Sequence, residues 1–91
     1  MDAALRQFVE EHKNLFWYTP KDKLFEISDE LLVETILNYG TLNDVKELFR
    51  LLGIKKAAEI FFHSINLSER RKNNYYPEVC NFFTLLFKRY A

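Results

Sequence analysis

The sequence contains few residues that break helices or build tight turns: of 91 residues, two are glycine and two are proline. Connections between strands rely on glycine and proline, so a β-sheet protein of this length would need more of both. Apolar residues make up 48% of the chain, which favours a packed globule over disorder. The composition therefore predicts an all-α fold, an irregular orthogonal bundle of five or six short helices that forms one domain over residues 1–91.

Cysteine and long apolar runs are also scarce. The single cysteine, Cys80, excludes a disulfide within the chain and fits a reducing compartment. No apolar run approaches the roughly 18 residues that a membrane span requires. The opening Met1-Asp2-Ala3-Ala4 lacks the basic start and the apolar stretch of a secretion signal, so we expect a cytoplasmic protein that does not enter a membrane.

Neither sign of charge dominates, since 13 basic side chains balance 13 acidic ones. The charges are unevenly placed: residues 1–53 hold ten acids and six bases, whereas residues 54–91 hold three acids and seven bases. Net neutrality argues against a dedicated nucleic-acid-binding protein. The uneven placement of the charges is still compatible with a local basic patch in the second half of the chain.

Apolar residues recur at helical spacing in several stretches that carry recognisable end signals. The expected helices are residues 2–14, 29–39, 42–52, 55–65, 69–72 and 77–89. Ser28 is suited to cap the second helix, Thr41 with Asp44 resembles a capping box at the third, and Ser68 is suited to cap the short fifth helix. The last helix is apolar on more than one face, so either it is the central helix, which we expect, or one face meets a partner.

The connections between these helices depend on glycine and on aromatic residues. Gly40 and Gly53 each follow a predicted helix, and we expect Gly40 to adopt the left-handed conformation that ends many helices. Phe16 and Trp17 stand before Pro20, which disfavours helix in the residue preceding it. We expect both aromatic side chains to anchor this connection in the core.

The spacing of reactive side chains shows no catalytic or metal-binding motif. His12, His63 and Cys80 are candidate ligands or nucleophiles, but they fall in separate helices without a paired motif. The two glycines stand too far apart for a glycine-rich phosphate loop. We therefore expect no enzymatic activity, no metal, no cofactor and no small-molecule ligand.

Residues 42–65 follow the order helix, glycine turn, helix, which is also the order of a DNA-binding helix-turn-helix. The motif is divergent, because Phe49 stands where a small residue is usual and Glu59 stands where a buried aliphatic residue is usual. Basic side chains in and after the second helix are candidate phosphate contacts: Lys55, Lys56, Arg70, Arg71 and Lys72. DNA binding is therefore the alternative hypothesis for function.

The helices expected at residues 55–65 and 77–89 carry more apolar residues than one side of each can bury, and Phe16–Tyr18 and Tyr75–Tyr76 are two aromatic-rich segments. Such an excess indicates a contact surface for another protein or for a second copy of the chain. The candidate contact residues are Phe62, Tyr75, Tyr76 and Phe87. The leading hypothesis is a non-enzymatic protein-interaction module.

Several short patterns together resemble a small bacterial family of short, all-helical proteins. They are Leu15-Phe16-Trp17, Tyr39-Gly40-Thr41-Leu42-Asn43-Asp44, Leu48-Phe49, Leu52-Gly53, Ser64 to Ser68, and Asn81-Phe82, and the similarity spans roughly residues 14–90. By gene context, some members of that family look like neighbours or antitoxin partners of nucleotidyltransferase-type toxins. The resemblance implies an antitoxin-like protein and supplies no catalytic residues. The family often has an acid after the tryptophan, where this chain has Tyr18, so any role of that acid is absent here.

Overall fold

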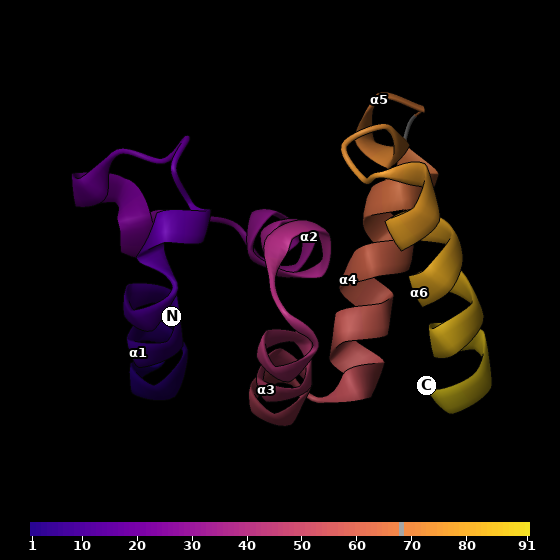
Figure 1. Ribbon diagram of the computed structural model, residues 1–91, viewed down its shortest axis with the longest axis horizontal. Coiled ribbons are helices and arrows are strands. Elements are labelled where there is room, and N and C mark those ends of the chain that lie inside the picture. Colours follow the sequence, from indigo (N-terminus) through magenta and orange to yellow (C-terminus); the bar gives the residue numbers. More distant parts are fainter. Residues whose placement is uncertain (68) are drawn as a thin grey trace.

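Short helices build the fold in the computed structural model, which describes residues 1–67 and 69–91, with the backbone alone at Arg71. Within these ranges the α-helices are α1 (Ala3–Glu11), α2 (Asp29–Tyr39), α3 (Leu42–Leu52), α4 (Ile54–Leu67), α5 (Glu69–Lys72) and α6 (Pro77–Tyr90) (Figure 1). Two 3-10 turns, η1 (Lys13–Leu15) and η2 (Lys21–Glu26), lie between α1 and α2. The predicted all-α bundle of short helices is confirmed, while the predicted cap Ser68 lies outside the described residues.

Side chains at the helix starts bind the backbone N–H groups that the first turn leaves free. Ser28 Oγ accepts a hydrogen bond of 3.1 Å from the Leu31 N–H at the start of α2. At the start of α3, Thr41 Oγ1 accepts from the Asp44 N–H at 3.2 Å, and Asp44 Oδ2 accepts from the Thr41 N–H at 2.8 Å. The capping box indicated by these two residue types is therefore complete.

The two glycines end their helices in different ways. Gly53 has a φ of 88°, which favours a residue without a β-carbon, and it turns α3 directly into α4. Gly40 is extended, with φ −78° and ψ 162°, because it leads straight into the N-cap of α3, so the predicted left-handed conformation is wrong. Glycine is required there because a β-carbon would lie 2.7 Å from the Ile36 carbonyl oxygen.

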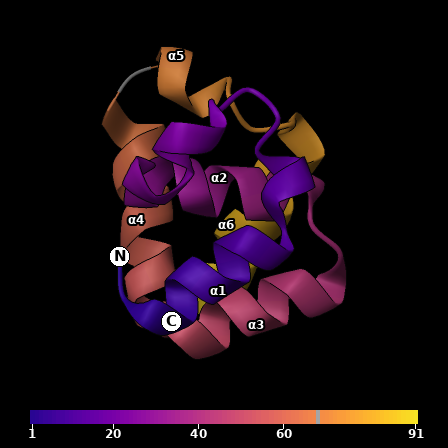
Figure 2. The same cartoon turned by 90° about the vertical axis from the view of Figure 1, so that its left-hand side faces the viewer.

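The central helix is α4, which packs against α2 and α3 on one side and against α6 on the other (Figure 1). α6 forms the outer layer at one end of the molecule, and α1 lies at the other end, where Figure 2 shows it beside α3. The expectation that the last helix is central is therefore wrong. α6 buries one side, which includes Phe83 and Phe87, and leaves Phe82 and Leu85 exposed on the other.

A cluster of phenylalanines holds α3, α4 and α6 together. The ring centroid of Phe87 lies 5.5 Å from that of Phe49, 5.3 Å from Phe61, 6.2 Å from Phe62 and 5.7 Å from Phe83. Centroid distances of this size are typical of packed aromatic pairs, each of which buries a large apolar area. Phe61 and Phe87 are almost completely buried, so the cluster forms the core between the three helices.

The connection from α1 to α2 is anchored by one aromatic residue rather than two. Phe16 is buried, and its carbonyl oxygen accepts a hydrogen bond of 2.9 Å from the Thr19 N–H, which turns the chain. Because Phe16 takes the inward position of this turn, Trp17 and Tyr18 point outward and are exposed. The expectation that Trp17 anchors the connection in the core is therefore wrong.

Candidate protein-binding surface

The four residues predicted to contact a partner do not share one surface. Tyr75 and Phe87 are buried, at 3% and 1% exposure, and Phe62 is partly buried against Phe87. The expectation that Tyr75 and Phe87 face a partner is wrong, because α6 turns Phe87 toward α4 and the Tyr75 ring packs on Phe61, with centroids 5.0 Å apart. Tyr76, at 50% exposure, is the most accessible of the four.

Tyr76 belongs to a group of exposed aromatic residues that no sequence pattern brings together. Its ring meets that of Tyr39 edge-on, with centroids 5.7 Å apart. The ring centroids of Trp17 and Tyr18 lie 3.7 Å apart, and both residues line a hollow together with Tyr39. We call Trp17, Tyr18, Tyr39 and Tyr76 the aromatic surface; their exposure ranges from 44% to 81%.

One side chain, Asn38, fixes the position of Tyr76. Asn38 Nδ2 donates a hydrogen bond of 2.9 Å to the Asn74 carbonyl oxygen, and Asn38 Oδ1 accepts one of 3.2 Å from the Tyr76 N–H. The two bonds join the last turn of α2 to the loop before α6, so Tyr76 is held beside Tyr39. Sequence reasoning missed this residue because an asparagine near a helix end has many local backbone partners.

Charges of both signs surround the aromatic surface. Glu34 lines the hollow within it, and Lys13 and Lys21 line an adjacent hollow that Trp17 also lines. The hydroxyl oxygens of Tyr39 and Tyr76 lie 3.5 Å apart, and this contact raises the pKa of Tyr39 above its ordinary value. An aromatic centre with a polar rim is the typical composition of a protein–protein interface.

The residues predicted to contact nucleic acid fall into two groups at opposite ends of α4. Lys55 and Lys56 are exposed in its first turn, whereas Arg70 and Lys72 are exposed in α5, beyond its last turn (Figure 1). The side chain of Arg71 lies outside the described residues. Because α4 has 14 residues and is therefore about 21 Å long, these bases do not form one continuous patch.

α4 also lacks the freedom of a recognition helix, which has to enter the major groove of DNA. It lies between α2 and α3 on one side and α6 on the other (Figure 1). Four of its residues face the core: Ala57, Ala58, Phe61 and Ser64. On its exposed side, Glu59 adds a negative charge that phosphate groups would repel.

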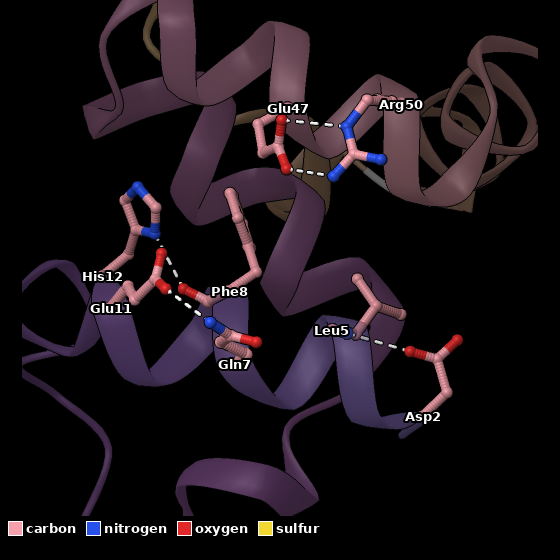
Figure 3. A network of polar contacts seen from close by, with 8 residues as sticks. All are labelled: Asp2, Leu5, Gln7, Phe8, Glu11, His12, Glu47 and Arg50. Carbon is pink, nitrogen blue, oxygen red and sulfur yellow. Dashed lines mark hydrogen bonds and ion pairs between the residues drawn. The ribbon is translucent and has the colours of Figure 1, made fainter.

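Polar contacts between neighbouring turns line the α1–α3 contact. Figure 3 shows Gln7 Nε2 donating to Glu11 Oε1 at 3.0 Å on α1, and Glu47 paired with Arg50 on α3. Each pair joins residues three or four positions apart on one helix and is exposed, so its effect is to support that helix.

The three candidate metal ligands or nucleophiles stay apart. His12 bonds to Asp44 between α1 and α3, His63 is exposed on α4, and Cys80 is buried on α6. Over residues 1–67 and 69–91, no three His, Cys, Asp or Glu side chains gather where they could hold a metal ion. Of the helices described, none has both the length and the apolar character needed to cross a membrane.

Comparison with protein-family models, with curated proteins and with solved structures finds no match for this chain.

Proposed function

We propose that the chain is a non-enzymatic protein-binding module that contacts its partner through the aromatic surface. The observation that supports this most strongly is the exposure of Trp17 at 63% and of Tyr18 at 81%. Tryptophan and tyrosine are the residues in which the binding energy of protein interfaces concentrates. Covering such rings with a partner removes a large apolar area from water, which is favourable.

The aromatic surface is also held in place before any partner arrives. The buried Phe16 fixes the turn that carries Trp17 and Tyr18, and the two hydrogen bonds of Asn38 fix Tyr76. Tryptophan and tyrosine have only two side-chain torsions, so ordering them costs little conformational entropy. A surface that is preorganised in this way binds more tightly than a mobile one of equal area.

The resemblance to the small bacterial family leads to the most specific form of this proposal. In this form the chain is antitoxin-like and its partner is a nucleotidyltransferase-type toxin in the bacterial cytoplasm. The single Cys80, which has no second cysteine to pair with, is compatible with that compartment. The mixed charges around the aromatic surface suit a folded protein partner better than a polyanion.

Native mass spectrometry of tagged protein, recovered gently from its own source cells, tests the proposal. We expect a second protein in stoichiometric amount with the unmodified chain. The double variant Trp17→Ala, Tyr18→Ala should lose it, and both residues are exposed, so the fold should persist. Tyr90→Ala is a matched control, because Tyr90 is an exposed tyrosine outside the aromatic surface.

Two results would count against the proposal. A partner that stays bound to the double variant excludes the aromatic surface as its site. Recovery of the unmodified chain only as a monomer or a homodimer counts against a partner of a different sequence.

DNA binding is the alternative to this proposal, because Gly53 joins α3 to α4 in the order of a helix-turn-helix and Lys55 and Lys56 are exposed beside it. The packing of α4 between α2, α3 and α6 counts against it. A phosphate interface would lose affinity with salt by about 0.9 decades per decade of salt for each phosphate contact. Replacing the basic residues by alanine should then weaken duplex binding: Lys55, Lys56, Arg70 and Arg71. Unchanged duplex affinity in that variant rules this candidate out.

A further inference from the structure

The outward side of α6 carries a stripe of four residues. We call it the α6 stripe: Glu78, Phe82, Leu85 and Arg89. Successive members are four, three and four positions apart, which places them on one side of a helix with 3.6 residues per turn. The buried residues of α6 lie on the opposite side: Cys80, Phe83 and Phe87.

The two apolar residues at the centre of the α6 stripe stay in water in the single chain. Phe82 is 54% exposed and Leu85 is 71% exposed, and neither belongs to the hydrophobic core. α6 forms an outer layer in Figure 1, and the exposed fractions of Phe82 and Leu85 show that the described residues leave much of both side chains in water. Leu42, which is 65% exposed, lines one groove together with Phe82 and widens the apolar area.

The order of residues along the α6 stripe makes it complementary to itself. An acid stands at its start, an aromatic and an aliphatic residue at its centre, and a base at its end. In an antiparallel pair with a two-fold axis between Phe82 and Leu85, Phe82 of each copy meets Leu85 of the other. The same axis places Glu78 of each copy opposite Arg89 of the other, whereas a parallel pair would oppose like charges.

We propose that a second copy of this chain binds along the α6 stripe, with the two α6 helices antiparallel. The unoccupied apolar centre supplies the attraction, and the charges at the two ends fix the direction and the register. Lys88 is exposed beside Arg89 and adds to the positive end, where the guanidinium of Arg89 also lies 5.5 Å from the Tyr90 ring. This contact is independent of the proposed partner interaction, because it uses none of the four residues of the aromatic surface.

The length of α6 determines how strong a dimer we expect. A helix of 14 residues gives a contact about 21 Å long and one helix wide. Such a contact buries less than the roughly 1,200 Å² of standard stable interfaces. The pair should therefore dissociate in the micromolar range and exist as monomer and dimer at ordinary laboratory concentrations.

Sedimentation-velocity ultracentrifugation over a concentration series measures dimerisation. Variants that reverse the charges at the two ends of the α6 stripe test the contact. Glu78→Arg and Arg89→Glu each turn both ion pairs of the symmetric dimer into like-charge pairs, and each should weaken dimerisation about tenfold or more. A mixture of these two variants pairs arginine with glutamate at both ends, so it should dimerise where each alone does not. The double variant Glu78→Arg, Arg89→Glu should likewise recover dimerisation.

Two further variants show whether a loss of dimerisation comes from the α6 contact itself or from a general change in charge or folding. Leu85→Glu places a charge at the apolar centre and should abolish the dimer, whereas Glu59→Arg changes an exposed charge on α4 and should leave it intact. Circular dichroism checks that each variant keeps its helices. An unmodified chain that stays monomeric up to several hundred micromolar, or single variants that dimerise as well as their mixture does, would overturn the proposal.

Discussion

His12 and Asp44 meet across the α1–α3 contact, with Nε2 of the imidazole 2.8 Å from Oδ1 of the carboxylate. The other ring nitrogen, Nδ1, lies 2.7 Å from the Phe8 carbonyl oxygen, a contact drawn in Figure 3. A carbonyl and an ionised carboxylate only accept hydrogen bonds, so both contacts are satisfied when the imidazole carries a proton on each nitrogen. Asp44 also completes the capping box of α3, so the charged pair ties the end of α1 to the start of α3.

This pair should make the free energy of unfolding depend on pH. Partial burial alone would lower the pKa of His12, but its bonds to the Phe8 carbonyl and to Asp44 outweigh burial and raise the pKa. The resulting stabilisation is complete below the unfolded-state pKa of about 6.5 and is lost as pH rises through the higher folded-state pKa.

The sign is opposite for the carboxylate. Burial alone would raise the pKa of Asp44, but the bonds from the Thr41 N–H and from His12 lower it below its ordinary value. Its stabilisation is complete above about pH 3.9 and is lost as pH falls through the lower folded-state pKa. Together the two residues should contribute most between about pH 4 and 6.5.

Urea unfolding measured from pH 4 to pH 9 checks this expectation. His12→Gln should lose the decline in stability above pH 6.5, and His63→Gln, a matched change at an exposed histidine, should keep it. The same decline in both variants would show that His12 does not cause it.

Replacing Tyr75 by phenylalanine should stabilise the fold. The Tyr75 hydroxyl is buried, and burial raises its pKa far above the ordinary range, so it stays neutral. Among the residues described, it finds no hydrogen-bond partner. Because an unsatisfied buried hydroxyl is costly, Tyr75→Phe should raise the free energy of unfolding by about 1 kcal/mol, whereas Tyr76→Phe, at an exposed site, should leave it nearly unchanged. A loss of stability in Tyr75→Phe would mean that the hydroxyl is bonded.

Alanine at either glycine should destabilise the fold, and the effect should be larger at Gly40. A β-carbon at Gly40 would lie 2.7 Å from the Ile36 carbonyl oxygen, and a backbone atom cannot move aside as a side chain can. At Gly53 no described atom lies within 4 Å of an added β-carbon, so the cost arises from the φ of 88° alone. We expect a loss of about 2 kcal/mol for Gly40→Ala and about 1 kcal/mol for Gly53→Ala in urea unfolding. The reverse order would contradict the geometry at Gly40.

Removing the Asn38 amide should loosen the loop that carries Tyr76. Asn38→Ala loses the acceptor of the Tyr76 N–H, so amide hydrogen exchange at Tyr76 should become faster while exchange at the core residues of α4 stays slow. Asn66→Ala, a matched change at an exposed residue of α4, should leave the exchange at Tyr76 as it is. Unchanged exchange at Tyr76 in Asn38→Ala would show that Asn38 does not hold it.

The helices and their ends could be predicted from the sequence because they depend on local signals. Thr41 with Asp44 marked the start of α3 and Gly53 marked its end, which are effects within a few residues of the chain. The conformation of Gly40 could not be predicted, because it depends on how closely the next helix follows.

The placement of the exposed aromatic residues could not be predicted, because it depends on which helices become neighbours. Phe82 and Phe87 stand in the same apolar helix, yet α4 covers Phe87 and leaves Phe82 exposed. Similarly, Trp17 and the buried Phe16 are adjacent and both apolar, and the turn decides which of them points inward. Tyr39 and Tyr76 come together where Asn38 binds the Tyr76 N–H, a contact between residues nearly 40 positions apart.

The central claim, that a partner protein covers the aromatic surface, is tested most directly at Trp17, because the chain contains one tryptophan. Labelling this chain alone with 5-fluorotryptophan gives a single fluorine resonance at the proposed contact, and the partner recovered by mass spectrometry is then titrated in. We expect that resonance to shift and broaden to saturation at one equivalent, with Tyr90→Ala behaving in the same way. A resonance that stays at its free position while the complex forms would contradict the claim, since Trp17 would then remain in water when the partner is bound.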